Sequence, residues 1–252
     1  MTPTPDRRAN RRRLRLPAGW AFSVVGLVVI AAAAAAVTRS AIFAAATIDV
    51  RGNHHLGRGE ILRLAGVSEK TNLMWFSPGR VEDVLEGDPW IADASVTRAL
   101  PSTLTISIRE RMPIAVVEGG RAFVVASDGT ILGPAEASQM TSALPSIHAS
   151  YRRVTTAAAL PASTPGLIVL RSMPASLRKL VMGVRLDSKG FLTVELDGGA
   201  VAIYGDASQS AAKAAAVQAL LRYAARRGIE PRRIDVRAPD RPAMIPAPTV
   251  DS

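Results

Sequence analysis

The 252-residue sequence contains no cysteine and only three histidines. Without cysteine the chain has neither disulfide bonds nor thiolate metal ligands, so any exported part must be stabilised by packed apolar cores. His54 and His55 are adjacent, and neighbouring strand residues point to opposite faces, so they are poorly placed to bind one metal ion. The only other histidine is the distant His148. We therefore expect no metal and no other cofactor.

Catalytic motifs are also missing. Gly52, Gly57 and Gly59 do not have the spacing of a dinucleotide-binding or phosphate-binding loop. Asp128 and Asp197 each precede a glycine, a pattern that favours a turn over paired acid-base catalysis. Neither a serine elbow nor a cysteine nucleophile is present. The sequence therefore predicts a protein that is not an enzyme.

The formal net charge of +10 is unevenly distributed. Six arginines and one aspartate give the first nineteen residues a charge of +5, and the 25 basic and 20 acidic residues that follow give another +5. The second excess is spread over more than 230 residues, as on an ordinary solvated surface. We therefore expect no nucleic-acid partner.

The run from Trp20 to Val37 contains eighteen residues without a charged side chain. With its small neighbours it reaches the roughly 20 residues that a helix needs to cross a hydrocarbon layer of ~30 Å. The arginines that precede it favour a cytoplasmic amino terminus. We predict a basic cytoplasmic tail over 1–19, a transmembrane helix over 20–38 and an extracytoplasmic remainder.

Two other interpretations of this run were weighed. A secretory signal also has a basic start, and residues 44–46 offer a small-residue cleavage site, but its apolar region is usually about 7–15 residues. A buried helix of a soluble domain is disfavoured by the flanking arginines and by the lack of a polar face. A retained membrane anchor fits the run best.

After the anchor, residues 47–112 combine two helical patterns with three strand patterns. The second helix has a capping serine at Ser77, a proline at its first turn, and Val81, Val84 and Leu85 directed inward. The predicted elements, in order, are a strand near 48–50, helices over 59–66 and 77–87, and strands over 91–99 and 103–110. The order predicts an α+β domain whose two helices cover one face of a sheet.

Beyond Pro113 the pattern changes to short strands and turns, from which we predict an antiparallel β domain with a C-terminal amphipathic helix. Residues 133–164 lack periodicity and are predicted to be loop. The predicted elements are strands over 114–117, 122–126, 130–132, 182–186, 191–196, 200–204 and 234–237, helical turns within 167–177, and a helix over 207–227. The proline-rich residues 241–252 are predicted to be a flexible tail.

The segments "TIDVRGNHHL" and "GDPWIADASVTRALPSTLTISIRERMPIAVV", preceded by a single apolar span, resemble the POTRA domain of the FtsQ/DivIB family of bacterial cell-division proteins. The segment "VAIYGDASQSAAKAAAVQALLRYAARRG", followed by "RRIDVRAPDRPAM", is similar to the end of the family's β domain. The resemblance implies a POTRA domain over 45–113 and an FtsQ-type β domain over 114–240. It also implies a location in the cell membrane at the division septum.

The last predicted strand is the best candidate for a partner site. A short terminal strand followed by prolines is expected at a sheet edge, where a partner strand can be added through main-chain hydrogen bonds. The alternative is an edge covered by the chain's own tail, which the sequence alone favours; the family resemblance reverses that preference. By resemblance, this strand receives FtsB in a complex that also contains FtsL, which implicates Ile234, Asp235, Val236, Arg237 and Arg185. Ala238 stands where the family has an aromatic residue, so the resemblance leaves the side-chain contacts there open.

The aromatic residues were assigned separately. Trp90 is expected in the core of the smaller domain, whereas Trp75 and Phe76 could belong either to the core or to an exposed partner surface.

The resulting hypothesis is a division scaffold that binds FtsB-like and FtsL-like partners and helps to recruit and regulate the septal peptidoglycan synthase complex. One alternative is a POTRA-bearing secretion or transport component, although no series of lipid-facing strands is evident. A secreted wall hydrolase is a further alternative, for which the sequence offers no catalytic residues.

Overall fold

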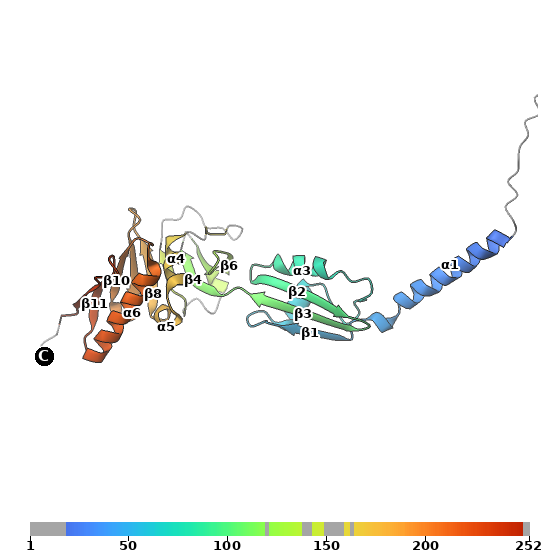
Figure 1. The fold of residues 1–252 in the computed structure, drawn as a ribbon, viewed down its shortest axis with the longest axis horizontal. Coiled ribbons are helices and arrows are strands. Elements are labelled where there is room, and N and C mark those ends of the chain that lie inside the picture. Colours follow the sequence, from blue (N-terminus) through green and yellow to red (C-terminus); the bar gives the residue numbers. More distant parts are fainter. Residues whose placement is uncertain (1–18, 119–120, 138–142, 149–158, 162–163, 249–252) are drawn as a thin grey trace, which may run out of the picture.

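A computed structural model of the protein describes residues 19–118, 121–137, 143–148, 159–161 and 164–248 (Figure 1). Residues 1–18 of the predicted basic tail, about half of the predicted loop over 133–164 and the last four residues lie outside this part of the chain. Within the described part of that loop, the prediction is wrong for residues 133–134 and 146–148, which lie in strands.

The first helix, α1 (Gly19–Thr38), coincides with the predicted apolar helix. Its side chains are largely exposed, with Phe22 81% and Leu27 68% accessible. In the part of the chain that the structure describes, no helix meets both the length and the apolarity that a membrane crossing requires. The helix is therefore confirmed, and its crossing of a membrane stays a prediction.

The next five elements form a three-stranded sheet with two helices. They are β1 (Thr47–Arg51), α2 (Arg58–Leu64), α3 (Pro78–Glu86), β2 (Ile91–Ala99) and β3 (Thr103–Glu110). Strand β3 is central, parallel to β1 and antiparallel to β2. The predicted order of strand, helix, helix, strand and strand is confirmed.

Alternation in β3 and helical spacing in α3 explain how this unit buries its apolar residues. Leu104, Ile106 and Ile108 alternate along β3 and are at most 6% exposed. Val81 and Leu85, four residues apart, place one face of α3 on the sheet. Val84 was also predicted to point inward. Its side chain is 50% exposed, because it lies next to the buried face of α3 and is not part of it.

A nine-stranded sheet follows, in the order β12-β11-β10-β9-β8-β7-β4-β5-β6. Its strands are β4 (Pro113–Glu118), β5 (Ala122–Ala126), β6 (Ile131–Pro134), β7 (Ser146–His148), β8 (Val181–Leu186), β9 (Leu192–Leu196), β10 (Val201–Gly205), β11 (Pro231–Asp235) and β12 (Ala243–Pro246). Short 3₁₀ turns also occur within the described residues, for example at Ala41–Phe43, Ala135–Ala137 and Asp197–Gly199.

The larger sheet is mixed, so the prediction of an antiparallel domain is wrong. Strand β7 is parallel to both β4 and β8, and β11 is parallel to β10. Parallel neighbours need a long crossover connection, which α6 (Ser210–Arg227) provides between β10 and β11. Between β7 and β8 the chain includes α4 (Pro165–Ser172) and α5 (Ala175–Arg178).

Figure 1 shows α4, α5 and α6 together on one side of the larger sheet. The core between these layers includes Leu167, Leu170 and Val217 from the helices and Val184 and Val194 from the strands. The opposite face of the sheet is covered at the β4-β5-β6 end by a smaller apolar cluster. Toward β12 that second face carries polar and partly exposed side chains.

Only Arg111 and Met112 separate β3 from β4, and the junction is held from both sides. The Arg111 guanidinium donates to the carbonyl oxygens of Pro89 and Ile91, and its Nε lies 2.8 Å from an Asp128 carboxylate oxygen. Trp90, predicted in the core, is half-buried and packs against apolar clusters on both sides of the junction.

Candidate functional site

The predicted partner strand is not the sheet edge. Strand β11 lies between β10 and β12, and Ile234 and Val236 are fully buried. The Val236 N–H donates to the Ile203 carbonyl at 3.0 Å, so it is used inside the sheet. The chain turns back after Arg237 and adds β12 antiparallel to β11, within the segment predicted to be a flexible tail. The edge prediction and the tail prediction are therefore both wrong for these residues.

The edge strand is β12, whose register pairs Ile245 with Arg233 and Met244 with Ile234. The Ala247 N–H donates to the Glu230 carbonyl at 2.7 Å, so the main-chain groups of Ala247 point toward β11. With the two-residue alternation of a strand, the main-chain N–H and C=O of Met244 point away from β11. They form the outer edge of the sheet. Pro242 and Pro246, which flank this segment, are compatible with an edge position.

Side chains cover the edges of the smaller sheet. On β2, the N–H groups of Ala94 and Val96 donate to the Glu86 and Glu82 carboxylates at 3.1 and 2.7 Å. On β1, the Arg58 guanidinium donates to the Ile48 carbonyl at 2.9 Å.

At the far end of the larger sheet, β6 is four residues long and ends in Pro134, which has no N–H. Such devices limit edge pairing. Strand β12 is also four residues long and ends in Pro246, so it differs from β6 in the hollow beside it and not in length.

An open hollow lies beside the β12 edge. It has a volume of about 480 Å³ and is lined by Gly199, Val201, Arg232, Arg233 and Ile245. The Ile245 side chain is 53% exposed, so an apolar contact is available next to two guanidinium groups. A strand added to β12 could place an apolar or acidic side chain in this hollow.

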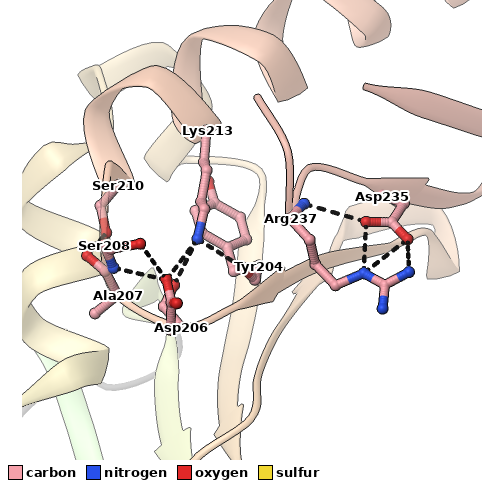
Figure 2. Close-up of polar contacts among 8 residues, drawn as sticks. All are labelled: Tyr204, Asp206, Ala207, Ser208, Ser210, Lys213, Asp235 and Arg237. Carbon is pink, nitrogen blue, oxygen red and sulfur yellow. Dashed lines mark hydrogen bonds and ion pairs between the residues drawn. The ribbon is translucent and has the colours of Figure 1, made fainter. Parts of the chain in front are cut away.

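The corner that precedes α6 is organised by a buried lysine (Figure 2). Lys213 is 2% exposed, and its ammonium donates to the main-chain carbonyls of Tyr204 at 2.8 Å and Asp206 at 3.0 Å. It also lies 2.8 Å from an Asp206 carboxylate oxygen. Hydrogen bonds from Lys213 and Ser208 lower the pKa of Asp206 to about 2. The lysine thereby fixes the end of β10 to the first turns of α6.

A second polar pair follows β11. The Arg237 guanidinium donates to both Asp235 carboxylate oxygens, from Nη2 to Oδ2 at 2.7 Å and from Nε to Oδ1 at 3.0 Å, and these bonds lower the pKa of Asp235 (Figure 2). Gly205 has a φ of +75°, and a Cβ at this position would lie 3.1 Å from Arg237 Cγ. Glycine is therefore required for its backbone conformation, and it also leaves room for the arginine. The pair fixes the chain where it leaves β11 for the turn to β12.

The structure brings four of the five predicted site residues together and separates the fifth. Residues 234–237 lie on or directly after β11, next to the edge strand. Arg185 lies on β8, four strands from β12 or about 19 Å at ~4.8 Å per strand, and it forms an ion pair with Glu195. The strand registers nevertheless align Arg185 with Asp235 in one row across the sheet.

The sequence analysis left open that the chain's own tail covers the last predicted strand, but it did not identify residues 243–246 as a strand. The signal was present in Ala243, Met244 and Ile245, a short apolar stretch between two prolines. Because prolines are tolerated on edge strands, this pattern could have been interpreted as an edge in place of a tail. Among the residues that the structure describes, no group of three or more His, Asp or Glu side chains could hold a metal ion.

Comparison with known families assigns both the small β-α-α-β-β unit and the mixed sheet to a class of POTRA-bearing cell division proteins. Residues 43–111 match the family model described as POTRA domain, FtsQ-type. Residues 115–237 match the model described as cell division protein FtsQ/DivIB, C-terminal. The chain belongs to the FtsQ/DivIB family of cell division proteins.

Three relatives named cell division protein FtsQ show how far the similarity extends. The proteins of Bradyrhizobium diazoefficiens and Syntrophotalea carbinolica are each 38% identical, over 39% and 42% of this chain. These matches cover 29% and 39% of the relatives' own lengths, so the chain spans well under half of either protein there. The Streptomyces bingchenggensis protein is 28% identical over 93% of this chain and 89% of its own length.

Proposed function

We propose that this protein is a division scaffold that binds FtsB-like and FtsL-like partners and helps to recruit and regulate septal peptidoglycan synthesis. Its proposed parts are a cytoplasmic tail over 1–19, a membrane anchor over 20–38, a POTRA domain over 45–113 and a β domain over 114–240. The proposed location is the cell membrane at the septum, with the carboxyl-terminal domains outside the cytoplasm.

One observation carries this proposal, namely the outward main-chain groups of Met244 on β12. An incoming strand can continue the ladder there and gain affinity from main-chain hydrogen bonds. The hollow beside Ile245 and Arg233 offers a place for one partner side chain, which gives specificity. In this proposal, the predicted residues 234–237 hold β12 in position, and residues 243–246 contact the partner strand directly.

The proposed anchor rests on the amino-acid sequence of residues 20–38, because no helix in the described part of the chain meets both the length and the apolarity of a membrane crossing. The run from Trp20 to Val37 contains no charge, and arginines precede it. Anchoring confines the outer domains to the membrane plane and raises their effective concentration toward partners anchored in the same way.

Met244→Pro tests the edge directly, with Met244→Ala as its matched control. Proline removes the outward N–H and places its ring against the incoming strand, while the inward bonds between β12 and β11 are kept. We expect the affinity for an FtsB-like extracytoplasmic segment to fall about tenfold or more, since about 1.4 kcal/mol corresponds to tenfold. Met244→Ala keeps the donor and should stay within about threefold of the unsubstituted protein.

Titration calorimetry measures the affinity, and urea unfolding of each variant checks the fold. An unchanged affinity for a folded Met244→Pro protein would exclude β12 as the partner edge.

The cellular role needs a separate test, namely depletion of the protein with rescue by an amino-terminal fluorescent fusion. Long cells without septa, together with a fusion at division sites, would support the scaffold. Normal division with the fusion spread around the envelope would favour the secretion alternative.

A further inference from the structure

Trp75 is exposed in the loop between α2 and α3. Its accessibility is 68%, whereas its neighbour Phe76 packs against the core of the smaller domain. An exposed tryptophan is costly to leave in water, because the indole ring is large and mostly apolar. The loop therefore presents an apolar surface that the fold itself does not use.

The loop is bonded to the end of α1. The Asn72 side-chain amide donates to the Thr38 carbonyl at 2.9 Å, and Thr38 is the last residue of the helix. The Leu73 N–H donates to the Phe43 carbonyl at 2.7 Å, and the Ala45 N–H donates to the Thr71 carbonyl at 2.9 Å. These bonds hold Trp75, three residues after Asn72, close to the point where the apolar helix ends.

The shape of the loop is fixed by one arginine. Arg98 Nη1 donates to the carbonyl oxygens of Leu73 at 2.7 Å, Met74 at 3.2 Å and Phe76 at 2.9 Å. Carbonyl groups on both sides of Trp75 are thus turned toward β2. The exposure of Trp75 therefore belongs to a defined loop conformation.

Two more apolar side chains are exposed at the same end of the domain. Ile42, in the 3₁₀ turn after α1, is 65% exposed, and Leu100, in the turn between β2 and β3, is 50% exposed. The Thr47 N–H donates to the Ser102 carbonyl at 3.1 Å, which ties that turn to the start of β1. Figure 1 shows this end of the smaller domain lying next to α1.

We propose that Trp75, Ile42 and Leu100 form a membrane-contact surface that rests in the interfacial layer of the bilayer from which α1 emerges. This inference depends on the proposed anchoring of α1. The occupant is lipid because the loop is bonded to the last residue of the apolar helix, so an α1 that crosses the bilayer brings the loop to its surface. Tryptophan is enriched at that depth, where its ring is in an apolar layer and its N–H can reach water.

The contact gives the smaller domain a second attachment. The bonds between residues 71–73 and residues 38–45 already restrict rotation of the domain about the end of α1. A loop seated in the lipid interface adds a second restraint and sets the orientation of the outer domains to the membrane.

The test uses fluorescence of the full-length protein in bilayers that contain phospholipids brominated near the headgroup. The chain has three tryptophans, so Trp20→Phe leaves Trp75 and Trp90. Trp90 lies at the opposite end of β3 from Trp75, because its carbonyl accepts a hydrogen bond from the Arg111 N–H, just after the last residue of β3. At ~3.3 Å per residue, the length of β3 separates the two tryptophans by about 25 Å. Adding Trp75→Phe to Trp20→Phe isolates the contribution of Trp75.

We expect the brominated lipid to quench the Trp20→Phe protein and most of that quenching to be lost in the Trp20→Phe/Trp75→Phe protein. A Val28→Cys variant, labelled with a nitroxide in this cysteine-free chain, reports separately on α1. If the label at position 28 is exposed to lipid but the two tryptophan variants are quenched equally, the proposed contact is overturned and the anchor is retained. A water-exposed label at position 28 would overturn the anchor, and the contact with it.

Discussion

Replacing Lys213 by methionine tests what the buried ammonium contributes at the corner before α6. Methionine keeps most of the apolar stem, so the change mainly removes three hydrogen bonds, of 2.8, 3.0 and 2.8 Å, to Tyr204 and Asp206. The bond to the Tyr204 carbonyl is buried, and a lost hydrogen bond from a charged donor costs about 1.5–3 kcal/mol. The Asp206 carboxylate is 72% exposed and can be rehydrated, so it adds little.

We therefore expect Lys213→Met to lower the free energy of unfolding by about 2–3 kcal/mol. At ~1–3 kcal/mol per molar urea, the midpoint of urea unfolding should fall by about 1 M. Asp206→Asn, the matched control, removes the exposed ion pair but leaves the lysine bonded to the two carbonyls. It should therefore destabilise the protein clearly less than Lys213→Met.

Salt provides the deciding measurement for this prediction. An exposed ion pair is screened at 1 M salt, whereas a buried ammonium-to-carbonyl bond is screened much less. The loss caused by Lys213→Met should therefore persist at high salt. Equal losses for the two variants, both abolished by salt, would refute the assignment of Lys213 as a donor to buried carbonyls.

The remaining predictions concern the same region. Because the pKa of Asp206 is lowered to about 2 from its ordinary 3.8, its charge stabilises the fold above about pH 4, and this contribution is lost as the pH falls toward 2. Acid titrations of unfolding should therefore give a shallower slope for Asp206→Asn over this interval, and an identical slope would contradict the linkage. Burial raises the pKa of Tyr204, whose hydroxyl has no hydrogen-bond partner among the described residues. Tyr204→Phe should leave the free energy of unfolding unchanged or raise it by about 1 kcal/mol in urea titrations, and a loss above ~1 kcal/mol would show that the hydroxyl is bonded.

The smaller domain was predictable because its local signals agree with its packing. Ser77 and Pro78 start α3, Gly87 ends it, and the alternation in β3 is uninterrupted, so each boundary fell within one or two residues. The apolar helix α1 was equally evident from its uncharged run. In these segments the residues that define the element also define its buried face.

The larger sheet was predicted less well, for two physical reasons. Strand β7 has only three residues, too few to show a period, and its place in the sheet depends on β4 and β8, which are distant in the sequence. Strand β12 is flanked by prolines, which usually indicate the end of ordered structure. Strand β12 forms because it pairs with β11, and the local sequence pattern gives no information about this tertiary contact.

The predicted partner strand was expected at the sheet edge, whereas the structure places it one strand inside that edge, and its role in partner binding stays a prediction. The side chains of Asp235 and Arg237 bond to each other. The side chains of Ile234 and Val236 are buried in the core. The carbonyl partners of Lys213 could not be predicted from the sequence, because they depend on how Tyr204 and Asp206 are placed beside the helix.

The link between β3 and β4 has only two residues, so it holds the two sheets at a nearly fixed distance from each other. Arg111 joins both sheets through its bonds to Pro89, Ile91 and Asp128, so the link has almost no slack. If α1 is fixed in the bilayer, β12 stands at a nearly constant distance above it. A partner anchored in the same membrane would then need a rigid segment long enough to extend from the bilayer to β12. Binding would depend on the length of that segment as well as on the hydrogen bonds and side-chain contacts at the β12 edge.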